Sequence, residues 1–511
     1  MTSSLLQKLQ GWRGGAAVFV AGALTPLAFA PLSLWPVAIL GPALLFMLWL
    51  FATPRQAAWL GGLYGLGLFG TGIYWIFISV HLHGFVPLLM SLLVTGSLMA
   101  LMAAYFALVG YTVARFFPRN YERRHARYKL LLVIPAAWVL GEWFRGWFLT
   151  GFPWLSLGYS QLDTALLGVA PILGVFGVSW LVALSAALLA ALLLDRRKWG
   201  IYAAALALLW GGSALLKQIE WGEAEAEPLT VTLLQGNIPQ DLKWHPSVRK
   251  PTIDMYAELT RQNWGSDLVI WPETALPAFY YEVEQFLDTL EADAQEHDTD
   301  LLIGLLDRDR QTGNYYNSMV SLGSSRGLYH KQHLVPFTEY LPLKDLLGSV
   351  VRFIQVPMSD FSAGDSDQPL LAVAGHKVGI SICFEDAFGE EVIHTLPEAG
   401  LLVNVSNDAW FDDSSAPPQH LQMARMRAAE TARYMLRATN TGITAIVNER
   451  GEVVSRAPQF QVVALTGEVQ PRSGVTPYVV GGNAFVVLLA MAALGLAVWR
   501  LKPAPVRPAT P

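Results

Sequence analysis

VGISICFED, residues 378–386, is the stretch that decides how the second half of this chain folds. Its almost wholly apolar start predicts a short strand buried on both faces, as in layered α/β folds. The run ends in Cys383, the only cysteine of the chain, and acidic residues follow almost at once. A lone cysteine is most often a buried packing residue. Whether Cys383 is a nucleophile therefore depends on the groups that other strands bring to it.

Two further segments place reactive side chains near the ends of buried-strand patterns. WPET, residues 271–274, follows an apolar run and contains Glu273. YHKQHLVPFTEY, residues 329–340, contains Lys331. A thiol becomes an effective nucleophile when a base or a cation activates it. A carboxylate, an ammonium and a thiol near the ends of buried strands therefore form a candidate active site.

The charges of the chain are unevenly divided. Charged residues make up 15% of the whole, against about 25% in ordinary soluble proteins. Residues 218–477 carry 36 acidic and 18 basic side chains, whereas the remainder carries 4 acidic and 17 basic ones. The net charge of −5 thus hides an acidic domain joined to a basic, apolar one. This acidity argues against nucleic-acid binding, and a single cysteine permits no intramolecular disulfide that would indicate a compartment.

The apolar part is predicted to be a polytopic α-helical membrane domain with eight spans, since each stretch approaches the ~20 residues that cross a bilayer. The stretches lie near residues 14–31, 33–52, 57–80, 84–114, 130–150, 165–194, 199–216 and 480–499. With eight spans, 15 of the 17 basic residues outside the acidic domain fall on one side of the membrane. By the positive-inside rule that side is cytoplasmic, so both termini are expected there and the acidic domain outside.

Four segments follow from this topology. They are a membrane domain over residues 1–219, an extracytoplasmic catalytic domain over 220–478, the eighth span over 479–501 and a disordered cytoplasmic tail over 502–511. The tail is rich in proline and has few apolar residues to bury.

The acidic domain is predicted to alternate strands and helices. Strands are expected over residues 229–235, 267–271, 301–305, 318–322, 378–383, 401–406, 443–448 and 462–467, and helices over 247–263, 282–298 and 418–437. The last helix carries several charged side chains, which are interpreted as a solvated face or as structural pairs. These are Arg425, Arg427, Glu430, Arg433 and Arg437.

Three motifs of the membrane domain are weaker. GLGLFG, residues 65–70, matches a dinucleotide-binding pattern, but inside a spanning stretch glycines serve close helix packing. His81 and His83 have no obvious further ligands nearby and are interpreted as interfacial polar residues, so no metal or other cofactor is expected. Charges at membrane depth are costly, so Glu142 and Arg145 are either a structural ion pair or a substrate-facing pair.

The three segments around the candidate base, cation and thiol resemble the Glu-Lys-Cys signature of the nitrilase, or carbon–nitrogen hydrolase, superfamily. This resemblance spans residues 228–470 and implies an α/β fold, the α-β-β-α sandwich. GFPW at residues 151–154 and NDAWF at 407–411, together with the apolar helices, resemble one membrane-bound branch, the apolipoprotein N-acyltransferase family. That second resemblance covers essentially the whole chain.

The resemblance implies a role for each candidate residue. Glu273 corresponds to the general base, Lys331 to the catalytic lysine and Cys383 to the nucleophile. Glu339 matches a second family carboxylate, which orients Lys331 or the incoming amine.

Further positions are associated with the pocket. Trp244, Phe384 and Glu385 match such positions, and Trp154 is either an interfacial anchor or part of a lipid entrance. Two departures from the family pattern do not touch the triad. Thr338 stands where glycine is common, and Phe384 stands where tyrosine is also used, so no hydroxyl is available there.

The implied reaction moves a fatty acyl chain from a phospholipid such as phosphatidylethanolamine to the free α-amine of an S-diacylglyceryl cysteine on an apolipoprotein. A Cys383 thioester carries the acyl group in between, and the implied location is the bacterial inner membrane with the catalytic domain in the periplasm. Two alternatives stay open. One is a membrane-tethered amidase with the same triad, and the other is a non-catalytic membrane scaffold on a nitrilase fold.

Overall fold

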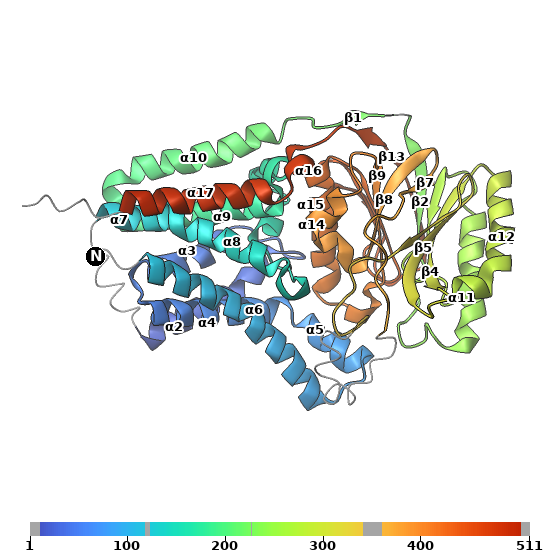
Figure 1. Ribbon diagram of the computed structural model, residues 1–511, viewed down its shortest axis with the longest axis horizontal. Helices are drawn as coiled ribbons and strands as arrows, with labels where there is room; N and C mark the ends of the chain where they lie inside the picture. The colour runs from blue at the N-terminus through green and yellow to red at the C-terminus, as the bar shows by residue number, and fades with distance from the viewer. Residues whose placement is uncertain (1–10, 118–122, 226, 341–359, 502–511) are drawn as a thin grey trace, which may run out of the picture.

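The computed structural model describes residues 11–117, 123–225, 227–340 and 360–501. It contains a bundle of apolar helices and an α/β sandwich of two sheets, which lie end to end along the long axis of the molecule (Figure 1). The tail predicted over residues 502–511 lies outside the described residues. So do four basic residues that were used to assign the topology, namely Lys8, Arg119, Lys502 and Arg507.

The bundle has an apolar helix in each of the eight stretches predicted to span a membrane. Its helices are α2 (Trp12–Leu24), α3 (Val37–Phe51), α4 (Pro54–Gly72), α5 (Trp75–Ile78), α6 (Leu88–Phe116), α7 (Arg123–Tyr128), α8 (Ile134–Arg145), α9 (Ala170–Leu194), α10 (Trp199–Leu216) and α17 (Ala484–Leu501), with short 3₁₀ and π turns between some of them.

The predicted number of spans is not confirmed. In the described part of the chain, three segments are long and apolar enough to cross a bilayer alone: Leu88–Phe116, Ala165–Leu194 and Arg196–Leu216. The pair Pro54–Gly72 and Trp75–His83, bent by 53°, makes a fourth if it counts as one span. Other helices are too short because a 15-residue helix such as α3 extends only about 22 Å, less than the ~30 Å of the hydrocarbon core.

Glycines bring the helices of the bundle into close contact. A Cβ atom added to Gly67 of α4 would lie 2.3 Å from the Phe19 carbonyl oxygen of α2, and one added to Gly65 would lie 2.7 Å from the Ala103 Cα of α6. The GLGLFG segment is therefore a helix-packing motif, as predicted, and not a nucleotide loop.

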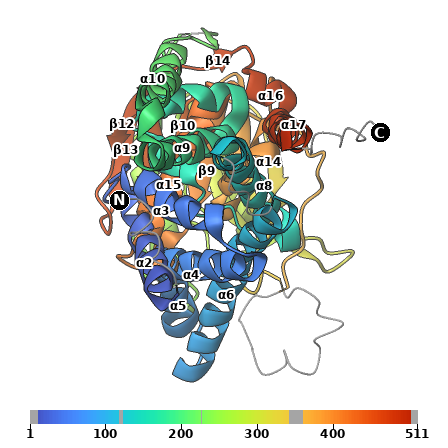
Figure 2. The ribbon, with the colours of Figure 1, turned by 90° about the vertical axis from the view of Figure 1, so that its left-hand side faces the viewer.

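Seen from its free end, the bundle has α2, α4 and α6 in one group and α8, α9, α10 and α17 in another, with α3 packed against both (Figure 2). The start of α2, the helix α7 and the end of α17 lie at the end of the bundle that is remote from the sandwich (Figure 1). The described chain thus enters and leaves the bundle far from the sheets.

The sandwich consists of two six-stranded sheets. The first has the order β13-β2-β3-β4-β5-β6, and the second has the order β12-β11-β10-β9-β8-β7. The strands of the first sheet are β2 (Leu229–Gln235), β3 (Leu268–Ile270), β4 (Asp300–Arg308), β5 (Tyr315–Leu322), β6 (Gly327–His330) and β13 (Val463–Val469). Those of the second are β7 (Leu371–Val373), β8 (His376–Ile382), β9 (Leu401–Ser406), β10 (Met435–Thr439), β11 (Ala445–Val447) and β12 (Val453–Arg456). A small pair, β1 (Glu223–Ala224) and β14 (Arg472–Ser473), lies apart from both.

Helices cover both outer faces of the sandwich. α11 (Pro246–Arg261) and α12 (Tyr280–Glu296) cover the first sheet, and α14 (Gly389–Ile393) and α15 (Ala416–Thr431) cover the second and face the bundle (Figure 1). The two sheets bury a shared apolar core, which explains why β2, β3, β8 and β9 are almost continuous apolar runs. The predicted α-β-β-α sandwich is confirmed.

α15 belongs to two cores at once. Met423 and Met426 are buried in the core of the bundle, whereas Leu421 and Ala424 are buried against the second sheet. Glu430 at the end of α15 also accepts a hydrogen bond of 2.6 Å from the backbone N–H of Val175 in α9. The helix therefore joins the sandwich to the bundle. A further helix, α16 (Pro477–Gly481), connects the sandwich to α17.

One predicted helix is wrong at its C-terminal end. The helix expected over 418–437 stops at Thr431, because Ala432 adopts a left-handed conformation with φ 53°, and β10 then pairs between β9 and β11. Arg427, Arg433 and Arg437 are buried, so the solvated-face interpretation is wrong for them and the structural-pair interpretation holds for Arg427 and Arg437.

Candidate active site

Three strands end at one edge of the sandwich and present the predicted base, cation and thiol. Glu273 follows β3, Lys331 follows β6, and Cys383 follows β8. The first two come from one sheet and Cys383 from the facing sheet. Their charges act on one another, since Glu273 and Lys331 both shift the pKa of the Cys383 thiol. The structure therefore brings together residues that are 110 positions apart in sequence.

The Glu273 carboxylate is held by two hydrogen-bond donors. The side-chain amide of Asn317 donates to Oε1 over 2.7 Å, and the backbone N–H of Asn407 donates to Oε2 over 2.7 Å. Glu273 is buried, with 8% of its surface exposed. A carboxylate that is fixed in this way keeps one orientation toward its neighbours.

Lys331 is an ammonium that stays charged. Its Nζ lies 2.9 Å from the Glu339 carboxylate, and its side chain is almost wholly buried. Burial lowers the pKa of Lys331, but Glu339 and Glu273 outweigh that effect and raise it above its ordinary value. The site therefore contains a fixed positive charge at every physiological pH.

Cys383 occupies a turn that few residues adopt. Its φ is 54°, in the left-handed region that non-glycine residues seldom enter. Burial and the Glu273 charge raise the pKa of the thiol well above its ordinary value, although Lys331 and the Ser406 hydroxyl lower it. The resting thiol is therefore protonated, so a base must take its proton when it reacts.

Glu385 connects the cysteine turn to the lysine loop. Its carboxylate accepts hydrogen bonds from the backbone N–H groups of Ile382 at 2.6 Å, Gln332 at 2.6 Å and His333 at 3.0 Å, and from the Tyr329 hydroxyl. Burial raises the pKa of Glu385 from 4.5 to about 7, against the opposing effects of Lys331 and these donors. Because its carboxylate accepts hydrogen bonds from four donors on both segments, Glu385 holds the cysteine turn against the lysine loop.

Aromatic side chains from the bundle cover the cysteine turn. Trp154 stacks on Phe384 with a centroid distance of 6.3 Å, and Phe152 lies 6.5 Å from the same ring. Trp154 is buried, and its indole N–H donates to Gln419 of α15 over 2.7 Å. Trp154 is thus part of the wall of the site.

Glu142 and Arg145 hold the loop that carries these aromatic residues. Arg145 donates to the carbonyl of Trp154 over 2.6 Å and to the Ser156 hydroxyl over 3.1 Å. Glu142 accepts from the backbone N–H of Leu157 over 3.1 Å. Both buried charges therefore have a structural role in positioning Trp154.

Trp244 lies in the loop between β2 and α11 and is 41% exposed. Its neighbour Lys243 is buried instead, and Nζ donates to the backbone carbonyl of Glu273 over 3.2 Å. Burial lowers the pKa of Lys243 from 10.5 to about 8. Of these two neighbours, Lys243 is the one with a contact to the triad.

Sequence reasoning missed several residues of the site. Asn407 and Asp408 begin the NDAWF motif, which was interpreted only as a family resemblance, and their position directly after β9 was an available signal of a place in the site. Asn317 lies inside β5, and His420 lies on a helix, where no local pattern marks them. Among the described residues, no group of three or more His, Cys, Asp or Glu side chains is placed to hold a metal ion.

Comparisons with known proteins agree with this architecture. Residues 21–188 match the family described as "Apolipoprotein N-acyltransferase N-terminal domain", and residues 230–477 match the family described as "Carbon-nitrogen hydrolase". The chain is 49% identical over 466 residues to a protein of Methylococcus capsulatus, covering 90% of this chain and 91% of that one. It is 40% identical to a protein of Vibrio cholerae, covering 98% and 99% respectively. Both relatives are named "Apolipoprotein N-acyltransferase". A solved carbon–nitrogen hydrolase from Helicobacter pylori is 16% identical, with a TM-score of 0.37 over 54% of this chain and 95% of that one.

Proposed function

This chain belongs to the apolipoprotein N-acyltransferase family, and we propose that Cys383 carries the transferred acyl group as a thioester. The protein is an N-acyltransferase that acts in lipoprotein biosynthesis. The acyl donor is a phospholipid of the phosphatidylethanolamine type, and the acceptor is the α-amine of an S-diacylglyceryl cysteine.

The observation that carries this proposal is the position of Cys383. The pKa of the thiol is shifted by the charges of both Glu273 and Lys331, and the cysteine turn is covered by aromatic side chains from the apolar bundle. A lipid-anchored donor and a lipid-anchored acceptor both reach such a site by lateral movement within the bilayer. An enzyme that hydrolyses small soluble amides would not need aromatic side chains from an apolar bundle around its thiol.

In the first half-reaction Glu273 takes the proton from the Cys383 thiol, and the sulfur attacks the ester carbonyl carbon. The charge that develops on the carbonyl oxygen is stabilised by Lys331 and by the backbone N–H of Phe384, the residue after the nucleophile. The ester C–O bond then breaks. Glu273 returns the proton to the leaving alcohol, which departs as a lysophospholipid, and the thioester remains.

In the second half-reaction the acceptor amine attacks the thioester carbonyl carbon. Glu273 takes a proton from the amine nitrogen and gives it to the departing sulfur as the C–S bond breaks. The products are an amide and the free thiol, so the enzyme returns to its starting state. Glu339 keeps Lys331 oriented through both steps, because its carboxylate lies 2.9 Å from Nζ.

The proposed orientation places the sandwich in the periplasm and both chain ends in the cytoplasm of a bacterium with an inner membrane. It is supported by the one-sided distribution of basic residues. It is also supported by the position of α7 and of the end of α17, which lie at the end of the bundle away from the sandwich (Figure 1).

Intact mass spectrometry tests the thioester directly. The full chain, incubated with phosphatidylethanolamine of a single acyl composition, is expected to gain the mass of one acyl group, and Cys383→Ser is expected to stay at its starting mass or form an oxygen ester slowly. Adding a diacylglyceryl peptide with a free amine should remove the adduct. A wild-type protein that turns over without ever carrying an adduct would contradict the proposal.

A further inference from the structure

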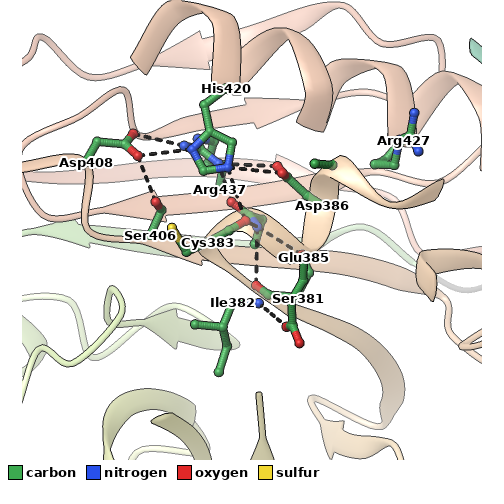
Figure 3. A network of polar contacts seen from close by, with 12 residues as sticks. Ser381, Ile382, Cys383, Glu385, Asp386, Ser406, Asp408, His420, Arg427 and Arg437 are labelled. Carbon is green, nitrogen blue, oxygen red and sulfur yellow. Dashed lines mark hydrogen bonds and ion pairs between the residues drawn. The ribbon is translucent and has the colours of Figure 1, made fainter. Parts of the chain in front are cut away.

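A buried group of charged residues lies behind the cysteine turn. It contains two carboxylates, Asp386 and Asp408, and two cationic groups, Arg437 and His420 (Figure 3). All four side chains are buried. They come from four different elements, since Asp386 follows Cys383 in its turn, Asp408 follows β9, Arg437 lies in β10 and His420 lies in α15.

The imidazole of His420 faces a carboxylate on each side. Nδ1 lies 3.1 Å from the Asp408 carboxylate, and Nε2 lies 3.0 Å from the Asp386 carboxylate. A neutral imidazole has a hydrogen on only one nitrogen, so its other nitrogen would point a lone pair at a carboxylate oxygen. Both contacts are favourable only when both nitrogens carry hydrogen. The geometry therefore favours an imidazolium.

The charges around His420 also balance only in that form. Arg437 contacts Asp386 at 3.4 Å and Asp408 at 2.9 Å, so each carboxylate has two cationic neighbours. With His420 protonated, the buried group is neutral, and with His420 neutral it keeps an uncompensated negative charge. Burial and Arg437 lower the pKa of His420, but Asp386 and Asp408 outweigh them and raise it from 6.5 to about 9.

His420 also contacts the backbone of the nucleophile. Its Nε2 lies 3.1 Å from the carbonyl oxygen of Cys383, and the side-chain amide of Asn404 donates to the same oxygen over 3.2 Å. Asn404 is held in turn by the Arg437 guanidinium. Two donors, His420 and Asn404, therefore fix the peptide that carries the left-handed turn.

A second link runs to the thiol side of the turn. Asp408 accepts a hydrogen bond of 2.8 Å from the Ser406 hydroxyl, and that hydroxyl lowers the pKa of the Cys383 thiol. The ring of Trp154, from the bundle, lies 5.7 Å from the His420 ring and places an aromatic face near the cation. His420 thus lies beside the Cys383 carbonyl and the Trp154 ring, and Asp408 links it to the hydroxyl that acts on the thiol.

We propose that His420 is a positioning residue for the nucleophile, whose imidazolium, held between Asp386 and Asp408, fixes the Cys383 carbonyl and the strained turn that presents the thiol to Glu273 and Lys331. This inference rests on the proposed role of Cys383. It assigns no contact between His420 and the substrate. Its effect is on the rate of reaction at sulfur and not on the binding of lipid.

Alkylation of the only cysteine measures this effect without any lipid chemistry. At pH 7.5, His420→Gln in the full-length protein is expected to slow the reaction of Cys383 with iodoacetamide about 10-fold, because the turn relaxes and the thiol leaves its base. Single-turnover acylation should fall ~10- to 100-fold, with an unchanged KM for phospholipid, as expected for a misplaced reactive group. His394→Gln, an exposed histidine of the same domain, is the matched control and should match wild type.

The pH dependence separates positioning by the charge from a passive packing role. Raising the pH through about 9 removes the proton from His420 in wild type, so the ratio of wild-type to His420→Gln alkylation rates should fall toward one. Asp408→Asn keeps the imidazole but removes one of the carboxylates that raise the pKa of His420. In this variant the alkylation rate relative to His420→Gln should therefore fall toward one at a lower pH than in wild type. A ratio that stays constant from pH 7 to 10 would overturn the proposal.

A measurement on the wild-type protein does not depend on any variant folding. ¹⁵N NMR of histidine-labelled protein at pH 8 should show one histidine with both ring nitrogens protonated while exposed histidines are neutral. Absence of such a histidine would overturn the proposal. If no acyl adduct forms on wild type but His420→Gln still slows alkylation, the thioester function fails and the positioning role stands.

Discussion

Asn317 donates its side-chain N–H to Glu273 over 2.7 Å and thereby orients the proposed general base. The same nitrogen lies 3.3 Å from the Glu339 carboxylate, so one amide separates the base from the group that holds Lys331. This hydrogen bond fixes the orientation of the Glu273 carboxylate, whose two oxygens are otherwise equivalent. Its removal should therefore affect the reaction more than the fold.

Asn317→Ala is expected to lower the rate of Cys383 acylation about 10- to 100-fold, since a misoriented base loses most of its advantage. Single-turnover release of lysophospholipid measures this. Asn314→Ala, at an exposed turn nearby, is the control and should be silent. Asn317→Asp should be worse than Asn317→Ala, because it adds a negative charge between two carboxylates.

The two half-reactions should be separable in time. One thiol holds the acyl group between donor and acceptor, so wild-type enzyme mixed with phospholipid alone should release about one equivalent of lysophospholipid per enzyme and then stop. Cys383→Ala should release none while it folds and inserts normally. A burst that is absent in wild type, with rates that require both substrates to be bound together, would count against the thioester.

Glu273→Gln keeps the shape of the side chain but cannot accept a proton. Because burial and nearby charge keep the Cys383 thiol protonated, acylation should fall ~100- to 10,000-fold, the range expected for loss of a general base. Acyl-adduct formation followed by intact mass provides the rate. Glu282→Gln, on the exposed start of α12, serves as a charge-matched control.

The same assay distinguishes a transferase from an amidase-like hydrolase. The wild-type acyl-enzyme should persist without an acceptor and discharge to a diacylglyceryl peptide that has a free amine, but not to the same peptide with a blocked amine. Rapid release of free fatty acid in the absence of any amine would favour the hydrolase.

Membrane topology can be tested independently of activity. A reporter fused after Pro511 should be active only in the cytoplasm, and a reporter inserted at the Asp309–Gly313 turn of the sandwich should be active only outside it. The reverse pattern at either site would contradict the proposed orientation.

Stability should depend on pH through His420. Its folded-state pKa lies above the ordinary 6.5, so the protonated ring contributes fully to stability below about pH 6.5, and this contribution is lost as the pH rises through about 9. The melting temperature of wild type should therefore fall more between pH 7 and 9.5 than that of His420→Gln. Parallel curves would mean that His420 titrates alike in the folded and unfolded chain.

Lys331 follows β6 (Gly327–His330), which is not an apolar run, and the family resemblance assigned the roles of all three candidate residues. Glu273 and Cys383 were visible from the sequence pattern, because each lies just after a run of apolar strand residues and strands of a sandwich end at common edges. Asn317 was not, because a polar residue inside a strand looks like an ordinary solvent-facing position. His420 was not predicted because it lies on a helix whose charged residues suggested a solvent-exposed face.

That helix also shows why the boundary at residue 431 was missed. Hydrophobic periodicity identifies a helix with one apolar face and one polar face. α15 packs on both sides, and its Arg427 and Glu430 form a buried pair, so the pattern carried no sign of where the helix ended and β10 began. The prediction of eight spans is not confirmed for a related reason, since apolar composition alone does not reveal that a helix is bent or short.

The sharing of α15 between two cores has a consequence for how the molecule can be divided. Cutting the chain at its linkers would leave Met423, Met426 and the Arg427–Glu430 pair uncovered on the detached sandwich. An excised sandwich would expose an aggregation-prone apolar surface to water. It would also lose the hydrogen bond from the Val175 N–H to Glu430. The sandwich therefore depends on the bundle to cover one side of α15. Attaching the sandwich to a different membrane anchor requires that side of α15 to be redesigned first.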